Sequence, residues 1–365
     1  KPAAINLFFI EEPEAHTHPQ MQYIFIKNIK ALLKGNRERD DGITIQLQTA
    51  ITTHSSHIVS ECDFDDIKYL RKSSSTCDVK AKNLKSLQHE YKSEDDAEDI
   101  KLKKAYKFLK QYLTLNRAEL FFADKAIFIE GDTERILVPA MMRKVDREFS
   151  ALDETPLLSQ NISMVEVGAY SQTFEKFIVF IGVKSLVITD IDSYKEEIVY
   201  EDDGVTPAEY ANGNVKVTQN PVPPIQPEAN KTSNASLKFF FEQDDLDFYK
   251  GLSLEKKVLS KIDGSWVQQD DGYFLMAYQT EEGGYHGRSF EDAFFSLNKV
   301  LLGTDAEAFP SLTKKHFDIY IGSDDACPYD FAEKAVNSKP TLAIEILLNS
   351  EKIGENEFSN WQVPS

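Results

Sequence analysis

Residues 125–134 read Lys-Ala-Ile-Phe-Ile-Glu-Gly-Asp-Thr-Glu, and this stretch decides the fold class. Lys125–Ile129 is a short apolar run typical of a buried strand. Gly131 permits a tight turn into a helix that we expect to extend through Val145. Glu130 and Glu134 would then face one crevice at the carboxyl end of the strand. The stretch therefore predicts a strand, a turn and a helix with two carboxylates at their corner.

The alternation of strands and helices continues after this stretch. Residues 164–167 and 185–189 are predicted strands, and residues 173–181 are a predicted helix between them, as in an α/β domain with a mainly parallel sheet. The last strand ends at Asp190-Ile191-Asp192. On an extended chain these two aspartates point to the same face, which suits one hard cation or a pair. Range 193–283 loses the rhythm, and we expect an inserted excursion there and not a continuous sheet.

Each acidic motif also has a structural interpretation. An acid such as Glu134 is favoured in the first turn of any helix, and Asp-Ile-Asp is an ordinary turn sequence. Their combination in one α/β unit favours a metal site, because four carboxylates at adjacent strand ends repel one another unless cations neutralise them. Carboxylates without neighbouring His or Cys prefer Mg²⁺ or Mn²⁺ to zinc.

The N-terminal part predicts a second α/β segment. Residues 5–10 are expected to form a buried parallel strand that ends at Glu11-Glu12-Pro13, and a helix from Pro19 is expected to stop at Gly35. Residues 44–53 are a predicted strand that leads into His54. An acidic run at 93–100 gives way to a Lys-rich helix at 101–113, which we interpret as a hinge. Its lysines favour a solvated face over a phosphate-binding surface.

Composition narrows the class of protein. The chain has 365 residues, which predicts two or three globular domains. Its net charge of -19, from 41 Lys and Arg against 60 Asp and Glu, predicts modest non-specific affinity for DNA. No apolar stretch is long enough for a membrane helix. The three cysteines, Cys62, Cys77 and Cys327, support neither a disulfide framework nor a zinc site, which points to a reducing cytoplasm.

Several motifs resemble known families. Residues 128–134, 165–168 and 187–192 look like the glutamate, glycine and Asp-x-Asp motifs of the Toprim domain, a Rossmann-like fold shared by topoisomerases, primases and certain nucleases. Residues 7–19 are similar to the Walker B motif and D-loop of ABC-type ATPases, and residues 51–55 to their switch histidine. An ABC-type half followed by a Toprim domain is the arrangement of the OLD (overcoming lysogenisation defect) nucleases, which include the nuclease subunit of the Gabija anti-phage system. We expect the ATPase lobe and connector at 1–120 and the Toprim domain, with its insertion, at 121–365.

The resemblance implies roles for individual residues. Two divalent cations, Mg²⁺ or Mn²⁺, would be held by five acids: Glu130, Glu134, Asp190, Asp192 and Glu291. Asp292 is the alternative to Glu291 if the register shifts by one. Lys339 resembles the late lysine that stabilises charge in the transition state, and the resemblance implies that it would act with Glu130 in catalysis. On the residues alone, an ordinary exposed lysine at a helix start is an equally good interpretation of Lys339.

The ATPase half implies an incomplete nucleotide site. Glu12 would orient water, Glu11 would lie near Mg²⁺, and His54 would sense the γ-phosphate. The sequence contains no G-x-x-x-x-G-K-[ST] phosphate loop and no ABC signature, which departs from the family pattern. With Lys1 as its first residue, the sequence is expected to be a fragment that lacks ATPase activity, so that ATP binds only the intact protein. His16 and His18 have no third ligand nearby and predict no metal site.

These features together predict a metal-dependent DNA endonuclease or nickase with a two-metal mechanism. In the intact protein the resemblance implies control by the ATPase, a homodimer, a possible helicase-type partner, a role in phage defence or DNA processing, and a cytoplasmic location with no membrane partner. One alternative is a recombination-mediator-like DNA-binding module in which the Toprim acids are structural. Another is a topoisomerase-like or primase-like enzyme, although nothing singles out a nucleophilic tyrosine for strand passage.

Overall fold

The computed structural model describes residues 6–34, 37–38, 44–45, 47–72, 78–149, 155–303, 306–353 and 356–365. The expectations for Lys1, Ile5, Gly35 and Cys77 lie outside these ranges. The chain divides into two compact units, residues 1–123 with 173–183, and residues 124–172 with 184–365. The predicted division of the chain into domains at residue 120 stays a prediction. No helix in the described ranges is both long and apolar enough to cross a membrane.

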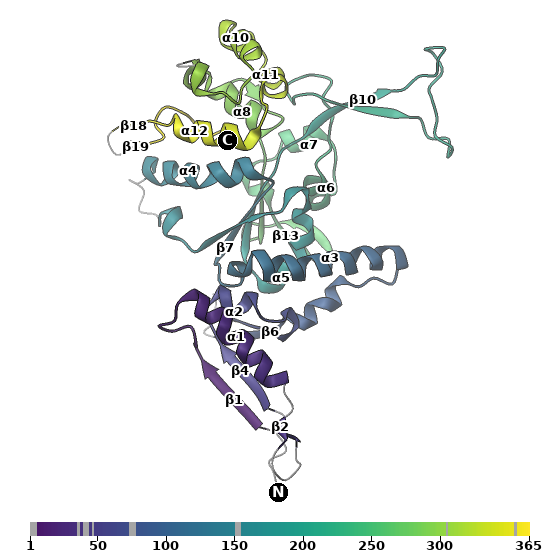
Figure 1. Cartoon of the computed structure of the whole chain (residues 1–365). Coiled ribbons are helices and arrows are strands. Elements are labelled where there is room, and N and C mark those ends of the chain that lie inside the picture. The colour runs from purple at the N-terminus through teal and green to yellow at the C-terminus, as the bar shows by residue number, and fades with distance from the viewer. Residues whose placement is uncertain are drawn as a thin grey trace. The chain divides into compact units, whose positions relative to one another are not determined.

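The first unit contains a small parallel sheet and several helices (Figure 1). Its elements are β1 (Asn6–Glu11), α1 (Pro19–Lys34), β2 (Arg37–Glu38), β3 (Thr44–Ile45), β4 (Leu47–Thr52), α2 (Ser56–Ser60), β5 (Lys68–Lys72), β6 (Val79–Asn83), α3 (Asp96–Asn116) and α5 (Glu175–Ile181). Helix α3 begins earlier than the sequence predicts, because the Asp95 side chain accepts a hydrogen bond from the Glu98 backbone N–H (2.8 Å) and acids are favoured in a first helical turn.

Strand β1 pairs in parallel with β4, as its apolar sequence predicts. The expectation that β1 is buried is wrong for its middle residues: Leu7, Phe8 and Phe9 are exposed. Among the described residues these two strands form a sheet of their own, and two strands are too few to cover each other's faces. The pairing still brings the ends of β1 and β4 together, with Glu11 opposite Thr52.

The second unit is an α/β domain with a helical C-terminal part (Figure 1). Its strands are β7 (Lys125–Ile129), β8 (Ile162–Glu166), β9 (Lys184–Ile188), β10 (Ser193–Ile198), β11 (Val217–Pro221), β12 (Lys231–Thr232), β13 (Val258–Ile262), β14 (Ser265–Gln268), β15 (Phe274–Ala277), β16 (Glu281–Glu282), β17 (Tyr285–His286), β18 (Lys352–Ile353) and β19 (Asn356–Glu357). Its helices are α4 (Asp132–Glu148), α6 (Ala235–Phe241), α7 (Leu246–Lys250), α8 (Phe290–Leu297), α9 (Lys299–Gly303), α10 (Lys314–Gly322), α11 (Pro328–Ala335) and α12 (Lys339–Leu348).

The central sheet has six strands in the order β14, β13, β15, β9, β7, β8. The pairs β15 with β9, β9 with β7 and β7 with β8 are parallel, and β13 runs antiparallel to both of its neighbours. Ile127 and Ile129 pack against Val138 of α4 beside the sheet. The α/β fold with a mainly parallel sheet is therefore confirmed.

The range 193–283 differs from its expected path. Its first part does leave the central sheet, because β10 pairs with β11 and β12 in a separate three-stranded sheet. Its last part returns: β13, β14 and β15 extend the central sheet, and β15 lies directly beside β9. The sequence did not predict that β13, β14 and β15 join the central sheet, because the segment between β10 and β13 shows no regular strand and helix spacing.

The C-terminal helices form one hydrophobic core with α4. Leu137 and Ala140 of α4 share a buried cluster with Leu342 and Ala343 of α12. Phe294 and Phe295 of α8 belong to the same cluster. This packing holds the first turns of α4, α8 and α12 in one region of the second unit.

Candidate active site

Two predicted site residues follow adjacent strands. Strands β7 and β9 are parallel neighbours, with Phe128 opposite Val187, so their carboxyl ends lie side by side. Glu130 follows β7 directly, and Asp190 comes two residues after β9. The Asp190 backbone N–H donates to Glu130 Oε1 over 3.3 Å, and the Thr189 hydroxyl donates to the same oxygen. The sequence prediction that Glu130 and Asp190 meet at one sheet edge therefore agrees with the structure.

Glu134 lies in the first turn of α4. Its Oε2 accepts a hydrogen bond from the Gly131 backbone N–H over 3.0 Å, which closes the turn between β7 and α4. Burial raises the pKa of Glu134, and the charges of Glu291 and Glu130 raise it further. The carboxylate is thus both a cap of its own helix and a member of the acidic group at the sheet edge.

Asp190 is held by groups from later in the chain. Gln279 Nε2 donates to Asp190 Oδ1 over 2.6 Å, and the Phe290 backbone N–H donates to the same oxygen over 3.0 Å. Burial raises the pKa of Asp190 well above its usual value. Four further carboxylates raise it in addition, in the order Glu291, Glu130, Asp192 and Glu134. The pKa of Asp190 is therefore raised by each of the other four predicted metal ligands.

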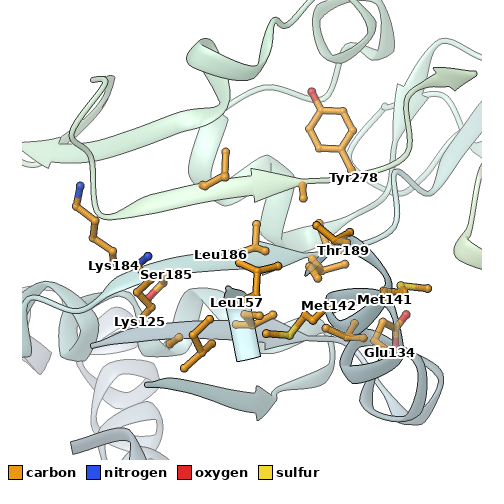
Figure 2. Close-up of a pocket in the computed structure, with 18 of the residues that line it drawn as sticks. Lys125, Glu134, Met141, Met142, Leu157, Lys184, Ser185, Leu186, Thr189 and Tyr278 are labelled. Atoms are coloured by element: carbon orange, nitrogen blue, oxygen red, sulfur yellow. The ribbon is translucent and has the colours of Figure 1, made fainter. Parts of the chain in front are cut away.

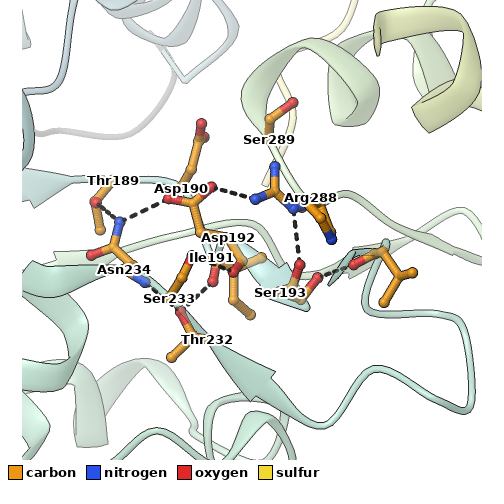
Figure 3. A network of polar contacts seen from close by, with 12 residues as sticks. Thr189, Asp190, Ile191, Asp192, Ser193, Thr232, Ser233, Asn234, Arg288 and Ser289 are labelled. Carbon is orange, nitrogen blue, oxygen red and sulfur yellow. Dashed lines mark hydrogen bonds and ion pairs between the residues drawn. The ribbon is translucent and has the colours of Figure 1, made fainter. Parts of the chain in front are cut away.

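Asp192 departs from the expected geometry. Its backbone has a φ of 47°, in the left-handed region, so Asp190 and Asp192 do not share an extended strand as the sequence predicts. Asp192 Oδ1 lies 3.1 Å from Arg288 Nη2, in an ion pair on one side of the turn. Asn234 approaches from the other side, with Nδ2 at 3.4 Å from Asp192 Oδ2 (Figure 3).

The structure separates Glu291 from Asp292. Asp292 is fully buried and accepts hydrogen bonds from the Arg288 and Ser289 backbone N–H groups and from the hydroxyls of Ser289 and Tyr285. Both of its oxygens therefore cap the start of α8. Glu291 is also buried, but its Oε2 instead meets the ammonium of Lys339 at 2.9 Å. The geometry favours Glu291 over Asp292 as the acid that serves the site.

Lys339 begins α12 and keeps 60% of its side chain exposed. Burial alone would lower the pKa of Lys339, but the carboxylates of Glu291, Asp190 and Glu134 outweigh that effect and raise the pKa. The ammonium is therefore held in its charged form beside the acidic group.

The donor set fits hard divalent cations. As the side chains stand, no three Asp, Glu, His or Cys residues in the described ranges lie in a group that could hold a metal ion. In Glu130, Asp190 and Glu291, however, the described residues donate hydrogen bonds to only one of the two carboxylate oxygens. The other oxygen of each carboxylate accepts no hydrogen bond from them. Burial also raises the pKa of Glu130, even though Thr189 donates to it. An all-oxygen donor set in which each carboxylate keeps one oxygen without a protein donor suits Mg²⁺ or Mn²⁺ ligation.

A largely apolar cavity of about 560 Å³ ends at the acidic group. It runs along one face of β7, β9 and β15, with Glu134 and Thr189 at one end and Lys125 and Lys184 at the other (Figure 2). Its walls include Met141, Met142 and Leu186. An apolar lining is unsuited to a charged phosphodiester, so the chemistry belongs to the polar end.

The ATPase-like residues also meet, within the first unit. His54 Nε2 lies 3.1 Å from Glu12 Oε1, and the His54 backbone N–H donates to Glu14 Oε1 over 2.5 Å. The Glu12 backbone N–H bonds to the Thr52 carbonyl over 3.0 Å. Glu12 and His54 come together because β1 and β4 are parallel neighbours. Glu11 ends β1 with an exposed side chain.

Several residues at the acidic site were not foreseen from the sequence, among them Asn234, Gln279 and Arg288. Asn234 and Gln279 belong to the range 193–283, for which the sequence offered no role. The available signal was local: Asn234 precedes the run Ala235–Phe241 and is a favourable helix N-cap residue. That signal predicts a helix start and says nothing about which carboxylate the amide contacts.

Comparison with known proteins gives two family matches. Residues 1–59 match the AAA ATPase domain, and residues 121–192 match the TOPRIM domain of overcoming lysogenization defect protein-like proteins. The chain is 29% identical over 360 residues to Endonuclease GajA of Bacillus cereus (strain HuB5-5). That alignment covers 94% of this chain and 45% of the endonuclease, so the chain spans less than half the length of this relative.

Two solved structures match part of the chain. The C-terminal region of the Xanthomonas campestris pv. campestris OLD protein is 15% identical, with 65% of this chain and 88% of that chain covered and a TM-score of 0.32. The C-terminal region of the Burkholderia pseudomallei OLD protein is 16% identical, with 61% and 86% covered and a TM-score of 0.29.

Proposed function

We propose, from the premise that residues 121–192 are a TOPRIM domain of the OLD-like family, that this chain hydrolyses DNA phosphodiester bonds as a metal-dependent endonuclease or nickase. The observation that carries the proposal is the contact between the acids after β7 and β9, where the Asp190 backbone N–H donates to Glu130 Oε1. The similarity to an endonuclease over 94% of the chain supports it.

Two divalent cations, Mg²⁺ or Mn²⁺, would be held by five carboxylates, those of Glu130, Glu134, Asp190, Asp192 and Glu291. When bound, such cations activate water and stabilise the leaving oxygen of a phosphodiester. The chain's own residues prepare that site. Thr189, Gln279 and the Gly131 N–H each fix one oxygen of a carboxylate, which orients the acids before any ligand arrives.

Lys339 supplies a fixed positive charge next to the acids. Its ammonium is anchored by Glu291, and its raised pKa keeps it protonated. A cation in this position can stabilise the negative charge that develops on the phosphate in the transition state. We therefore assign Lys339, with Glu130, to the catalytic step.

The test is nicking of supercoiled plasmid in the presence of Mg²⁺, Mn²⁺, Ca²⁺ or EDTA. We expect cleavage with Mg²⁺ or Mn²⁺ and none with EDTA, and we expect Glu130→Ala, Asp190→Ala and Lys339→Ala to abolish it. Glu148→Ala is the matched control, because Glu148 lies at the opposite end of α4 from Glu134 and pairs with Lys144. Undiminished cleavage by the three site variants would overturn the assignment. DNA binding by wild-type protein without metal-dependent cleavage would favour a mediator-like binding module.

For the intact protein, the resemblance to the OLD family supports a wider proposal. We infer that an ABC-type ATPase lobe regulates the nuclease, that the lobes form a homodimer, and that the protein acts in the cytoplasm in phage defence or DNA processing. A helicase-type protein is a candidate partner. Size measurement of the full-length protein with and without ATP tests the dimer.

A further inference from the structure

Asn234 lies where the insertion returns to the acidic site. It is 4% exposed and forms the N-cap of α6, with its side-chain oxygen accepting a hydrogen bond from the Leu237 backbone N–H over 3.0 Å. Its own backbone N–H donates to Thr232 Oγ1 over 3.1 Å. The side-chain oxygen and the backbone N–H of Asn234 are therefore both bonded to residues of the insertion.

The amide nitrogen of Asn234 contacts three acceptors at the site. Nδ2 lies 2.8 Å from Thr189 Oγ1 and 3.4 Å from Asp192 Oδ2 (Figure 3). It also lies 3.2 Å from Glu130 Oε1. The orientation of the amide follows from its surroundings, since the opposite orientation would turn the carbonyl oxygen toward two carboxylates and the NH₂ group toward the Leu237 N–H. A neutral donor thus sits between two acids that repel each other.

The base of the insertion is bonded to the same turn. The Ser233 backbone N–H and hydroxyl donate to the Asp192 carbonyl over 3.0 and 3.1 Å, and the Thr232 hydroxyl donates to the Ile191 carbonyl over 2.5 Å. Strand β12 also pairs with the start of β10, with Thr232 opposite Ser193. These bonds fix the position of residues 232–234 relative to Asp192.

We propose that Asn234 is a positioning residue that orients Glu130 and Asp192 for cation binding, and that the insertion fixes it in this place. The inference rests on the proposed metal-dependent function of the same carboxylates. A donor that bonds a metal ligand from behind reduces the freedom of the carboxylate and offsets part of its negative charge, and loss of such a partner commonly weakens metal binding about 10–100-fold.

The first test is Asn234→Ser, measured by Mn²⁺ titration calorimetry and by plasmid nicking. Serine is also a good N-cap, so α6 keeps its cap while the amide donor is lost. We expect the Kd for Mn²⁺ to rise about 10–100-fold and cleavage to recover largely at saturating Mn²⁺. Asn220→Ser is the matched control, because Asn220 Nδ2 donates to Glu197 on the exposed ribbon of β10 and β11. We expect it to behave as wild type.

The second test is Asn234→Asp, measured by thermal unfolding. Aspartate also caps the helix, but it places a third carboxylate against Glu130 and Asp192. We expect a lower Tm without metal and a larger Mn²⁺-induced rise in Tm than in wild type. If both variants match wild type in Tm and in Mn²⁺ affinity while wild type cleaves DNA, Asn234 is a helix cap only and the proposal is wrong. If wild-type protein binds Mn²⁺ but does not cleave DNA, the proposed nuclease function is wrong. The change in Mn²⁺ affinity caused by Asn234→Ser then decides the proposal about Asn234. Wild-type protein that binds no Mn²⁺ would overturn both.

Discussion

Lys339 Nζ lies 2.9 Å from Glu291 Oε2, in an ion pair that joins the first residue of α12 to the first turn of α8. The two partners differ in environment: Glu291 is 4% exposed and Lys339 is 60% exposed. The buried carboxylate of Glu291 is thus paired with an ammonium, that of Lys339, which solvent can still reach. A substrate phosphate could therefore approach this ammonium.

Lys339→Met is expected to reduce plasmid nicking by about 100-fold or more, because it removes a fixed positive charge from the reacting region. Its Tm without metal should fall, because the substitution leaves the buried carboxylate of Glu291 without its cation, so nicking is compared well below the Tm of both proteins. Lys334→Met is the control, because Lys334 is an equally exposed lysine of α11 that pairs with the exposed Asp330. Nicking by Lys339→Met within about twofold of wild type would contradict the catalytic role.

Glu291 and Asp292 are expected to respond in opposite ways to substitution. Asp292→Ala removes the acceptor of four hydrogen bonds in the core and should lower the free energy of unfolding by about 3 kcal/mol. Glu291→Gln should keep most of the stability of the metal-free protein but weaken binding of a second Mn²⁺. Urea unfolding and Mn²⁺ titration measure the two effects. The reverse pattern would assign the site to Asp292.

The sequence predicted those parts of the site that follow from regular structure. Strand β7 spans the predicted Lys125–Ile129, and Glu130 lies near Asp190 because β7 and β9 are adjacent parallel strands. The backbone of Asp192 was not predictable, because its positive φ accompanies two bonds to distant parts of the chain: its N–H donates to the Arg288 carbonyl, and its carbonyl accepts from the Ser233 N–H. Asn234 and Gln279 were missed because their positions depend on the path of a long irregular segment, which local propensity does not determine. Exposure of Phe8 and Phe9 likewise depends on what lies over β1, which periodicity does not report.

His286 should make stability depend on pH. Its Nε2 lies 2.8 Å from the Gln279 carbonyl, to which the ring N–H donates. Burial lowers the pKa of His286. Lys250 and Lys257 lower it further, whereas the bond to Gln279 and the charge of Glu281 raise it. Between the folded pKa and the unfolded value of about 6.5, the unfolded chain binds a proton that the folded chain does not, so stability falls as the pH drops through this window.

His286→Gln keeps a donor for the Gln279 carbonyl but cannot titrate. From about pH 7.5 to about pH 5.5, metal-free wild type should therefore lose more unfolding free energy than the variant, by up to about 1.4 kcal/mol per pH unit. Urea unfolding at several pH values measures the difference. Parallel stability curves for the two proteins would mean that His286 does not protonate differently on unfolding.

Glu12 and His54 are close enough to act together, yet this chain is expected to hydrolyse no ATP. His54 Nε2 lies 3.1 Å from Glu12 Oε1, with both side chains largely exposed, as a water-orienting acid and a γ-phosphate sensor would be. The sequence contains no phosphate-binding loop, and without that backbone cradle and its lysine the triphosphate has no anchor beside the pair. Phosphate release from Mg²⁺-ATP should therefore stay at background, and Glu12→Gln and His54→Ala should leave plasmid nicking by this chain unchanged. ATP turnover that persists through further purification and disappears in Glu12→Gln would contradict this prediction, because a contaminating ATPase would not respond to that substitution.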